Sequence, residues 1–142
     1  LMRGKPQRRL YMDIKNVDLE RLAREVKERG VEKQVILAST RYDVVRKWKA
    51  LVPESSTLLW MGRTEAELEK RFEELRKAKF ADVTQLQIHT HLVVDAEKIT
   101  RASVNPFAES DAFLIARGKE IREHGILFQT LPYGGSTPGV RY

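Results

Sequence analysis

The chain has 142 residues, of which 42 % are hydrophobic, no cysteine, and a formal net charge of +6. This is about the usual size of one domain and long enough to bury a core. The lack of cysteine excludes disulfides and thiolate metal sites, and no apolar run approaches the roughly 18 residues that a membrane-spanning helix needs. Basic residues are interspersed with acidic ones, as in EAELEKRFEELRKAK, which is typical of solvated helix faces rather than of a nucleic-acid surface.

The start of the chain, LMRGKPQRRL, has no apolar stretch behind its charges, so no signal peptide is visible. An upstream signal peptide stays open, because the chain begins with Leu1 and not with Met. We expect a soluble protein, with the cytoplasm as the favoured compartment, and with no nucleic-acid partner and no transmembrane segment.

Five apolar runs predict strands, and four amphipathic patterns between them predict helices. In chain order, the predicted strands are 10–14, 34–39, 56–61, 84–94 and 126–131, and the predicted helices are 18–30, 40–53, 64–80, 110–125. Strict alternation of strand and helix predicts an α/β fold with one parallel sheet. We expect a single domain over 1–142, with one long connection at 94–109 and a loose, Gly- and Pro-rich tail at 132–142.

The predicted helices begin at residues that can cap them: Asp18, Thr40, Thr64 and Ser110. Thr64 and Glu67 have the spacing of a capping box, and Leu68, Phe72 and Leu75 form the apolar stripe that follows. Gly118, inside the fourth helix, costs about 1 kcal/mol relative to Ala, which indicates close packing at that point.

The first predicted strand carries two charged residues on one face. Asp13 and Lys15 are two residues apart, so their side chains point to the same side of the strand, while Met12 and Ile14 suit the helix side. The plain alternative is that Asp13 and Lys15 simply pair with each other or with neighbouring loop amides. A ligand site is the other interpretation, because a buried unpaired charge costs several kcal/mol.

The fourth and fifth strands add further polar groups to the same side. Gln87 and His89 share the face opposite Leu86 and Ile88, and Gln129 stands in the middle of the last strand. An open sheet covered on both faces by apolar helices has little use for such groups, whereas the interior and mouth of a parallel barrel do. Trp60, at the end of the third strand, could be a pocket wall or core; Tyr42 could be either as well, and we expect His91 past the strand end.

Two stretches carry a resemblance to a known family: LYMDIKN with LERLAREVKERGVEKQVILAST, and then VRKWKALVPESSTLLW. They resemble the middle of the glycerophosphodiester phosphodiesterases, over roughly residues 8 to 135. Members have a TIM barrel in which one strand carries a Glu-Ile-Lys signature, and a later strand ends in a Ser-Phe-like pair before a helix and a Pro. Here Asp13 to Lys15, Ser39 with Thr40, and Pro53 occupy those places.

The resemblance implies a partial TIM (βα)8 barrel of about five parallel strands and about four helices, the second half of such a barrel. It implies hydrolysis of glycerophosphodiesters to glycerol phosphate and an alcohol. Asp13 would be a ligand of a divalent cation, Mg²⁺ or Ca²⁺, and Lys15 the phosphate contact. Asp13 is one methylene shorter than the usual Glu. The candidate substrate-binding residues are Lys15, Gln87, His89, Trp60 and Gln129.

The family's other motifs do not occur in this sequence. The His-Arg-Gly start, the Glu-x-Asp pair, the His-Asp pair and the closing Gly-Val-Asp-Gly pattern have no counterpart, so the expected catalytic histidine pair lies outside this chain. The missing half-barrel or a homo-oligomer is then the expected partner. Two alternatives stay open: a non-catalytic half-barrel that binds phosphate esters, and an open flavodoxin-like sheet that binds a small ligand at its strand ends.

Overall fold

The computed structural model describes Met2, residues 4–92 and residues 107–133. In these described residues, five strands alternate with four α-helices, as the sequence predicts. In chain order they are β1 (Leu10–Asp13), α1 (Leu19–Glu28), β2 (Val35–Ser39), α2 (Tyr42–Leu51), β3 (Ser56–Gly62), α3 (Glu65–Lys77), β4 (Gln85–His91), α4 (Asp111–Glu123) and β5 (Leu127–Tyr133), with a short 3₁₀ helix η1 (Glu32–Gln34) before β2.

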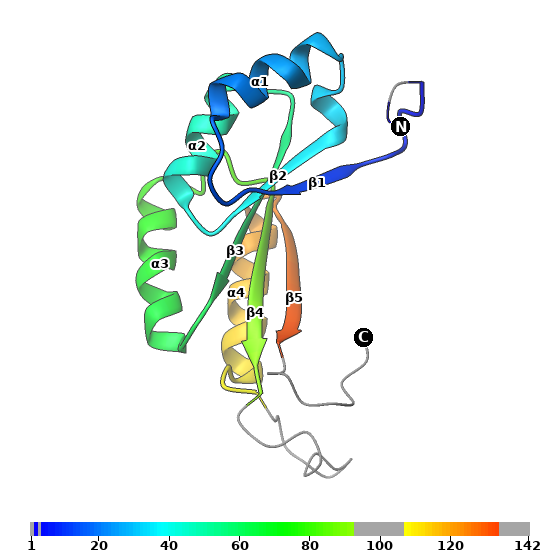
Figure 1. Ribbon diagram of the computed structural model, residues 1–142. Helices are drawn as coiled ribbons and strands as arrows, with labels where there is room; N and C mark the ends of the chain where they lie inside the picture. Colours follow the sequence, from blue (N-terminus) through cyan, green and yellow to red (C-terminus); the bar gives the residue numbers. More distant parts are fainter. Residues whose placement is uncertain (1, 3, 93–106, 134–142) are drawn as a thin grey trace.

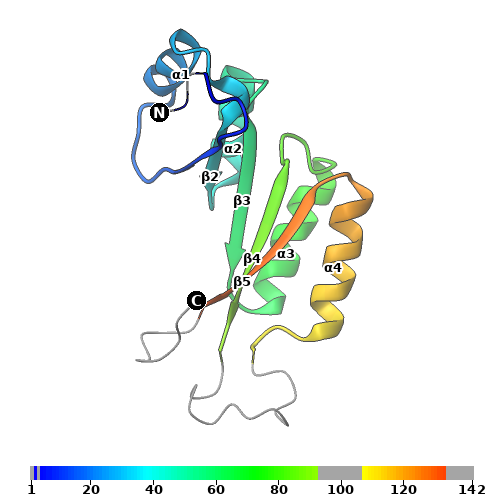
Figure 2. The same cartoon turned by 90° about the vertical axis from the view of Figure 1, so that its right-hand side faces the viewer.

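All five strands are parallel and lie in the order β1-β2-β3-β4-β5. The four helices lie along one side of the curved sheet, and in the described part of the chain no helix covers the other side (Figures 1 and 2). A doubly wound flavodoxin-like sheet would reverse its strand order and carry helices on both faces. The observed order is that of a partial (βα) barrel.

The sheet curves strongly around its helix-free side, which we call the concave face. The Tyr11 hydroxyl on β1 donates a hydrogen bond of 2.6 Å to Gln85 Oε1 on β4, across two intervening strands. In a flat sheet these strands would lie about 14 Å apart, three strand spacings, which is beyond the reach of the two side chains. The concave face therefore corresponds to the interior face of a barrel.

The hydrophobic core fills the space between the sheet and the helices. Leu68, Phe72 and Leu75 on α3 are at most 1 % exposed and pack with Leu86 and Ile88 of β4, which confirms the predicted stripe. A second cluster joins α1, α2 and the first two strands around the fully buried Trp48. Both clusters lie on the helix side, whereas the concave face carries the polar side chains of Gln85, Gln87, His89 and Gln129 beside a small apolar cluster of Ile36, Ala38, Leu58 and Trp60.

The helix ends follow the predicted caps, with one exception. The side chains of Asp18, Thr64 and Ser110 accept hydrogen bonds from backbone N–H groups of the first turn, and Thr64 with Glu67 forms a full capping box. The prediction of Thr40 as a cap is wrong, because α2 begins one residue later, after Arg41, and no side chain caps it.

Two further expectations concern α4 and β5. A Cβ on Gly118 would lie 2.8 Å from a ring carbon of Phe128, which confirms the close packing inferred there. Pro132 and Tyr133, assigned by the sequence to the loose tail, instead extend β5, where they pair with Thr90 and His91. A proline is tolerated because β5 is an edge strand. The rest of that tail, 134–142, and the connection up to 106 lie outside the described residues.

Among the described helices, none has the length and apolar character to cross a membrane.

Candidate functional site

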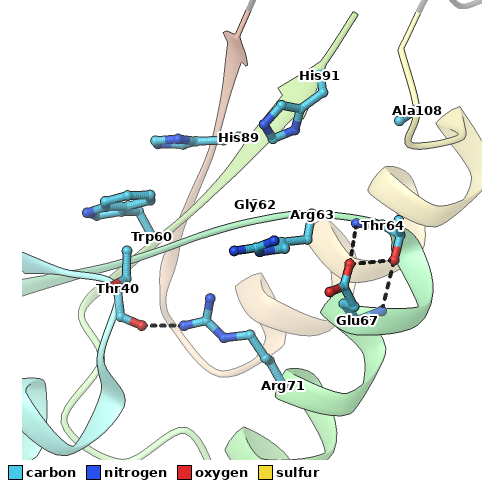
Figure 3. Close-up of a pocket in the computed structure, with 10 residues that line it drawn as sticks. All are labelled: Thr40, Trp60, Gly62, Arg63, Thr64, Glu67, Arg71, His89, His91 and Ala108. Atoms are coloured by element: carbon cyan, nitrogen blue, oxygen red, sulfur yellow. Dashed lines mark hydrogen bonds between the residues drawn. The ribbon is translucent and has the colours of Figure 1, made fainter. Parts of the chain in front are cut away.

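Two neighbouring hollows open where the strands end at their carboxyl termini. The large pocket has a volume of about 840 Å³ and is lined by Thr40, Trp60, Gly62, Arg63, Thr64, Glu67, Arg71, His89, His91 and Ala108 (Figure 3). The small pocket, of about 260 Å³, is lined by Asp13, Lys15 and other residues that follow β1 and β2. Thr40 and Trp60 line both, so the two hollows adjoin at the end of the sheet where barrel enzymes place their active sites.

Asp13 is the last residue of β1, Lys15 lies two residues beyond the strand, and the two form an ion pair. Lys15 Nζ lies 2.9 Å from Asp13 Oδ2, and the two side chains are 73 % and 56 % exposed. Lys15 Nζ also lies 5.6 Å from the centre of the Trp60 ring. An ion pair this exposed contributes about 0–1 kcal/mol to stability. The pair thus satisfies both charges at little energetic gain, and a ligand in the small pocket can replace either contact.

The predicted polar face exists as a chain of hydrogen bonds across the concave face. Gln129 Nε2 donates to Gln85 Oε1 at 3.1 Å, and Gln87 Nε2 donates to Gln129 Oε1 at 3.0 Å. His89 Nε2 lies 2.9 Å from Gln87 Oε1, an oxygen that accepts. Gln87 and Gln129 line neither of the two pockets. Gln87 contacts His89 directly, and Gln129 contacts Gln87. Direct substrate contact by Gln87 or Gln129 stays a prediction.

His89 and Trp60 form one wall of the large pocket. Their rings stack with centroids 4.5 Å apart and planes within 9°. Burial lowers the pKa of His89, the neighbouring His91 lowers it further, and Asp13 partly opposes both effects. His89 is therefore a neutral imidazole near pH 7, held by a glutamine on one edge and an indole on one face. The structure brings Trp60 and His89 together with Asp13 and Lys15, as the sequence predicts.

His91 was expected past the strand end, but it is the last residue of β4 and lines the large pocket. Its backbone N–H donates to Glu109 Oε2 at 3.1 Å, and its Nδ1 lies 3.8 Å from Glu109 Oε1. Glu109 is fully buried. Sequence reasoning missed Glu109, because an acidic residue beside the helix cap Ser110 looks like ordinary loop. Only its burial against β4 reveals the pairing.

Two arginines in the large pocket were also missed. Arg63 follows β3 directly, and its backbone has φ +129°, outside the range that side-chain-bearing residues normally adopt. Arg71, on α3, donates to the backbone oxygen of Thr40 at 2.5 Å, and burial lowers the pKa of its guanidinium. Arg71 lies in a helical charge pattern that predicts only a solvated face, and Arg63 lies in the turn before that helix. Their convergence on one pocket depends on the turn at Gly62 and Arg63, which periodicity cannot foresee.

Glu67, the carboxylate that lines this pocket, belongs to the capping box of helix α3. Glu67 Oε2 accepts hydrogen bonds from the Thr64 hydroxyl at 2.8 Å and from the Thr64 backbone N–H at 3.2 Å. These bonds, with the charge of Arg63, lower the pKa of Glu67, so it is ionised at neutral pH. The large pocket therefore holds two guanidinium groups and one carboxylate, a net positive balance.

The fit of a divalent cation rests on Asp13. Within residues 4–92 and 107–133, no group of three or more His, Asp or Glu side chains lies close enough to hold a metal ion. Asp13 can supply one hard oxygen ligand of the kind that Mg²⁺ and Ca²⁺ prefer, and the remaining ligands would have to come from elsewhere.

Comparisons with protein-family models, with curated proteins and with solved structures found no match to this chain.

Proposed function

We propose that this chain is the second half of a (βα)8 barrel that hydrolyses glycerophosphodiesters to glycerol phosphate and an alcohol with the help of a divalent cation. The observation that supports this is the meeting of Asp13 and Lys15 beside a cationic pocket at the carboxyl end of a parallel sheet. In the reaction, water attacks phosphorus, the P–O bond to the alcohol breaks, and the departing oxygen takes up a proton.

Three residues that line the small pocket have roles in this proposal, with His89 of the large pocket beside them. Asp13 supplies one carboxylate to Mg²⁺ or Ca²⁺, and such a cation, when bound, polarises the phosphoryl group. Lys15, whose ammonium already reaches Asp13 and lies over Trp60, contacts a non-bridging phosphate oxygen. Trp60 and His89 wall the site. The other metal ligands and the acid–base pair belong to the missing half-barrel or to a partner chain.

The test is hydrolysis of glycerophosphoinositol by the natural protein that carries this sequence, in Mg²⁺ or Ca²⁺, measured as released glycerol phosphate. Asp13→Asn removes the anionic ligand and should lower kcat/KM by at least about 100-fold, because metal stabilisation of the transition state is worth several kcal/mol. Asp111→Asn is the matched control, since Asp111 begins α4 and lines neither of the two pockets. Near wild-type turnover by Asp13→Asn would remove Asp13 from the metal site.

One observation favours a second candidate, a non-catalytic half-barrel that binds phosphate esters. The described residues bring cationic groups to the pockets but no three-ligand metal group. In that case the 142-residue chain alone should bind a phosphate ester without hydrolysing it, and should be a folded dimer that covers its open sheet edges. A monomer, or a chain that does not fold alone, would count against this candidate.

A further inference from the structure

We infer that the large pocket binds a second anionic group of the substrate, so that the preferred glycerophosphodiester carries a phosphate monoester on its alcohol. This inference rests on the proposed function for its first half, the phosphodiester held at Asp13 and Lys15. It adds the chemistry of the alcohol. Four observations support it: the charge balance of the large pocket, its position, the backbone of Arg63, and the state of the Trp60 ring.

The charge balance favours an anion. In the described part of the chain, neither Arg63 nor Arg71 forms an ion pair within 4.0 Å. The carboxylate that lines the same pocket, Glu67, is held by Thr64. Two guanidinium groups that project into a hollow with no carboxylate between them suit a phosphate, because a guanidinium donates paired hydrogen bonds to its oxygens.

The position of the pocket allows one ligand to reach both groups. Trp60 and Thr40 line both hollows, so the large pocket begins where the small one ends. Figure 3 shows the Arg63 and Arg71 side chains approaching the same space, from the end of β3 and from α3. A volume of about 840 Å³ lies within the range of small-molecule sites and accommodates a phosphorylated alcohol.

The backbone of Arg63 points to a functional reason for its position. Its φ of +129° is a conformation that a glycine would adopt more easily. Strained residues persist where the surrounding structure over-determines them, and they gather at ligand sites. Gly62 directly precedes it, and a Cβ at Gly62 would come within 3.1 Å of His91 Cε1. The strained turn thus places the Arg63 guanidinium opposite Arg71, and the lack of a side chain at Gly62 leaves room for the His91 ring.

A cationic alcohol such as choline lacks a comparable partner here. Choline is recognised by open aromatic faces, but the Trp60 ring is already stacked on His89 and lies under the ammonium of Lys15. The two guanidinium groups would repel a quaternary ammonium. The structure therefore orders the substrates: a phosphorylated alcohol first, a neutral alcohol second, choline last.

The experiment is calorimetric titration of the natural protein that carries this sequence, with divalent cations withheld so that the probes are not hydrolysed, with three probes: glycerophosphoinositol 4-phosphate, glycerophosphoinositol and glycerophosphocholine. The first two differ only in the second phosphate. We expect the first to bind at least about tenfold more tightly than the second. Arg63→Gln and Arg71→Gln should each abolish most of that preference and change glycerophosphoinositol binding less than twofold. Equal affinity for the first two probes, or a preference that survives both variants, would overturn the inference.

Three control variants separate the causes. Lys15→Gln should weaken both inositol probes by the same factor; if it changes neither, the proposed function fails while the arginine-dependent preference still tests the second site. Arg71→Lys keeps the charge and should retain part of the preference, which distinguishes charge loss from a packing defect. Arg46→Gln removes an exposed arginine that pairs with Asp82 and lines neither of the two pockets, so it should change nothing.

Discussion

The strain at Arg63 makes a quantitative prediction for Arg63→Gly. A side-chain-bearing residue held at φ +129° costs of order 1–3 kcal/mol. Glycine removes that strain but adds about 0.4–1 kcal/mol of conformational freedom to the unfolded chain. The net expectation is that Arg63→Gly stabilises the fold by about 1 kcal/mol. For a chain of this size that corresponds to a rise in Tm of roughly 3 to 4 °C.

The matched control is Arg63→Ala, which removes the same guanidinium but keeps a Cβ in the same backbone. Arg63 forms no ion pair within 4.0 Å among the described residues, so its side chain contributes little to stability. Arg63→Ala should therefore stay within about 0.5 kcal/mol of the wild type. Urea unfolding followed by circular dichroism measures the difference, with unchanged m-values as the sign that only stability has changed.

Binding separates the side chain from the backbone. Arg63→Gly and Arg63→Ala should lose the preference for glycerophosphoinositol 4-phosphate equally, although only the glycine variant gains stability. Should Arg63→Gly be no more stable than Arg63→Ala, the backbone at Arg63 is not strained. The inference would then lose its conformational support and would stand on charge and position alone.

Two other predictions concern the concave face and the core. His89 has a pKa below its ordinary 6.5, mainly through burial. The unfolded chain therefore binds more protons than the folded chain, and the free energy of unfolding should fall as pH drops through and below 6.5. The urea midpoints of unfolding at pH 7.5 and 5.5 should differ more in the wild type than in His89→Gln. An equal difference in both proteins would refute this role of His89. Gly118→Ala should destabilise by about 1 kcal/mol, because overpacking against Phe128 outweighs the helix propensity gained; a more stable variant in the same unfolding assay would show that the ring moves aside without loss.

The sequence predicts the fold well, because the fold depends on periodic features. Period-two and helical patterns locate the five described strands and four described α-helices within a few residues, though not the short 3₁₀ helix. The caps at Asp18, Thr64 and Ser110 depend on short-range chemistry that a sequence displays directly. The proximity of Asp13 and Lys15 needs only their two-residue spacing, although Lys15 lies beyond the end of β1. Thr40 fails as a cap although a threonine is favoured there, because α2 begins one residue later, after Arg41, and no side chain caps it.

The candidate site is predicted only in part, because half of it depends on tertiary placement. Trp60 and His89 stand on strands, so their neighbours follow from the strand order. Arg63 and Glu109 stand in turns, where no period indicates a direction, and each becomes visible only through a non-local fact. For Arg63 that fact is a strained backbone, and for Glu109 it is complete burial against His91.

Several residues at the carboxyl end of the sheet carry such costs, and Lys79, Phe80 and Asp82 in the turn before β4 also adopt positive φ. The strained Arg63, the buried Glu109 and the desolvated Arg71 all lie at the carboxyl end of the sheet, whereas the core clusters contain ordinary apolar packing. The same end carries Asp13 and Lys15, the pair to which the family resemblance gives a role. A ligand with two anionic groups accounts for both sets of residues, since each pocket then neutralises one group.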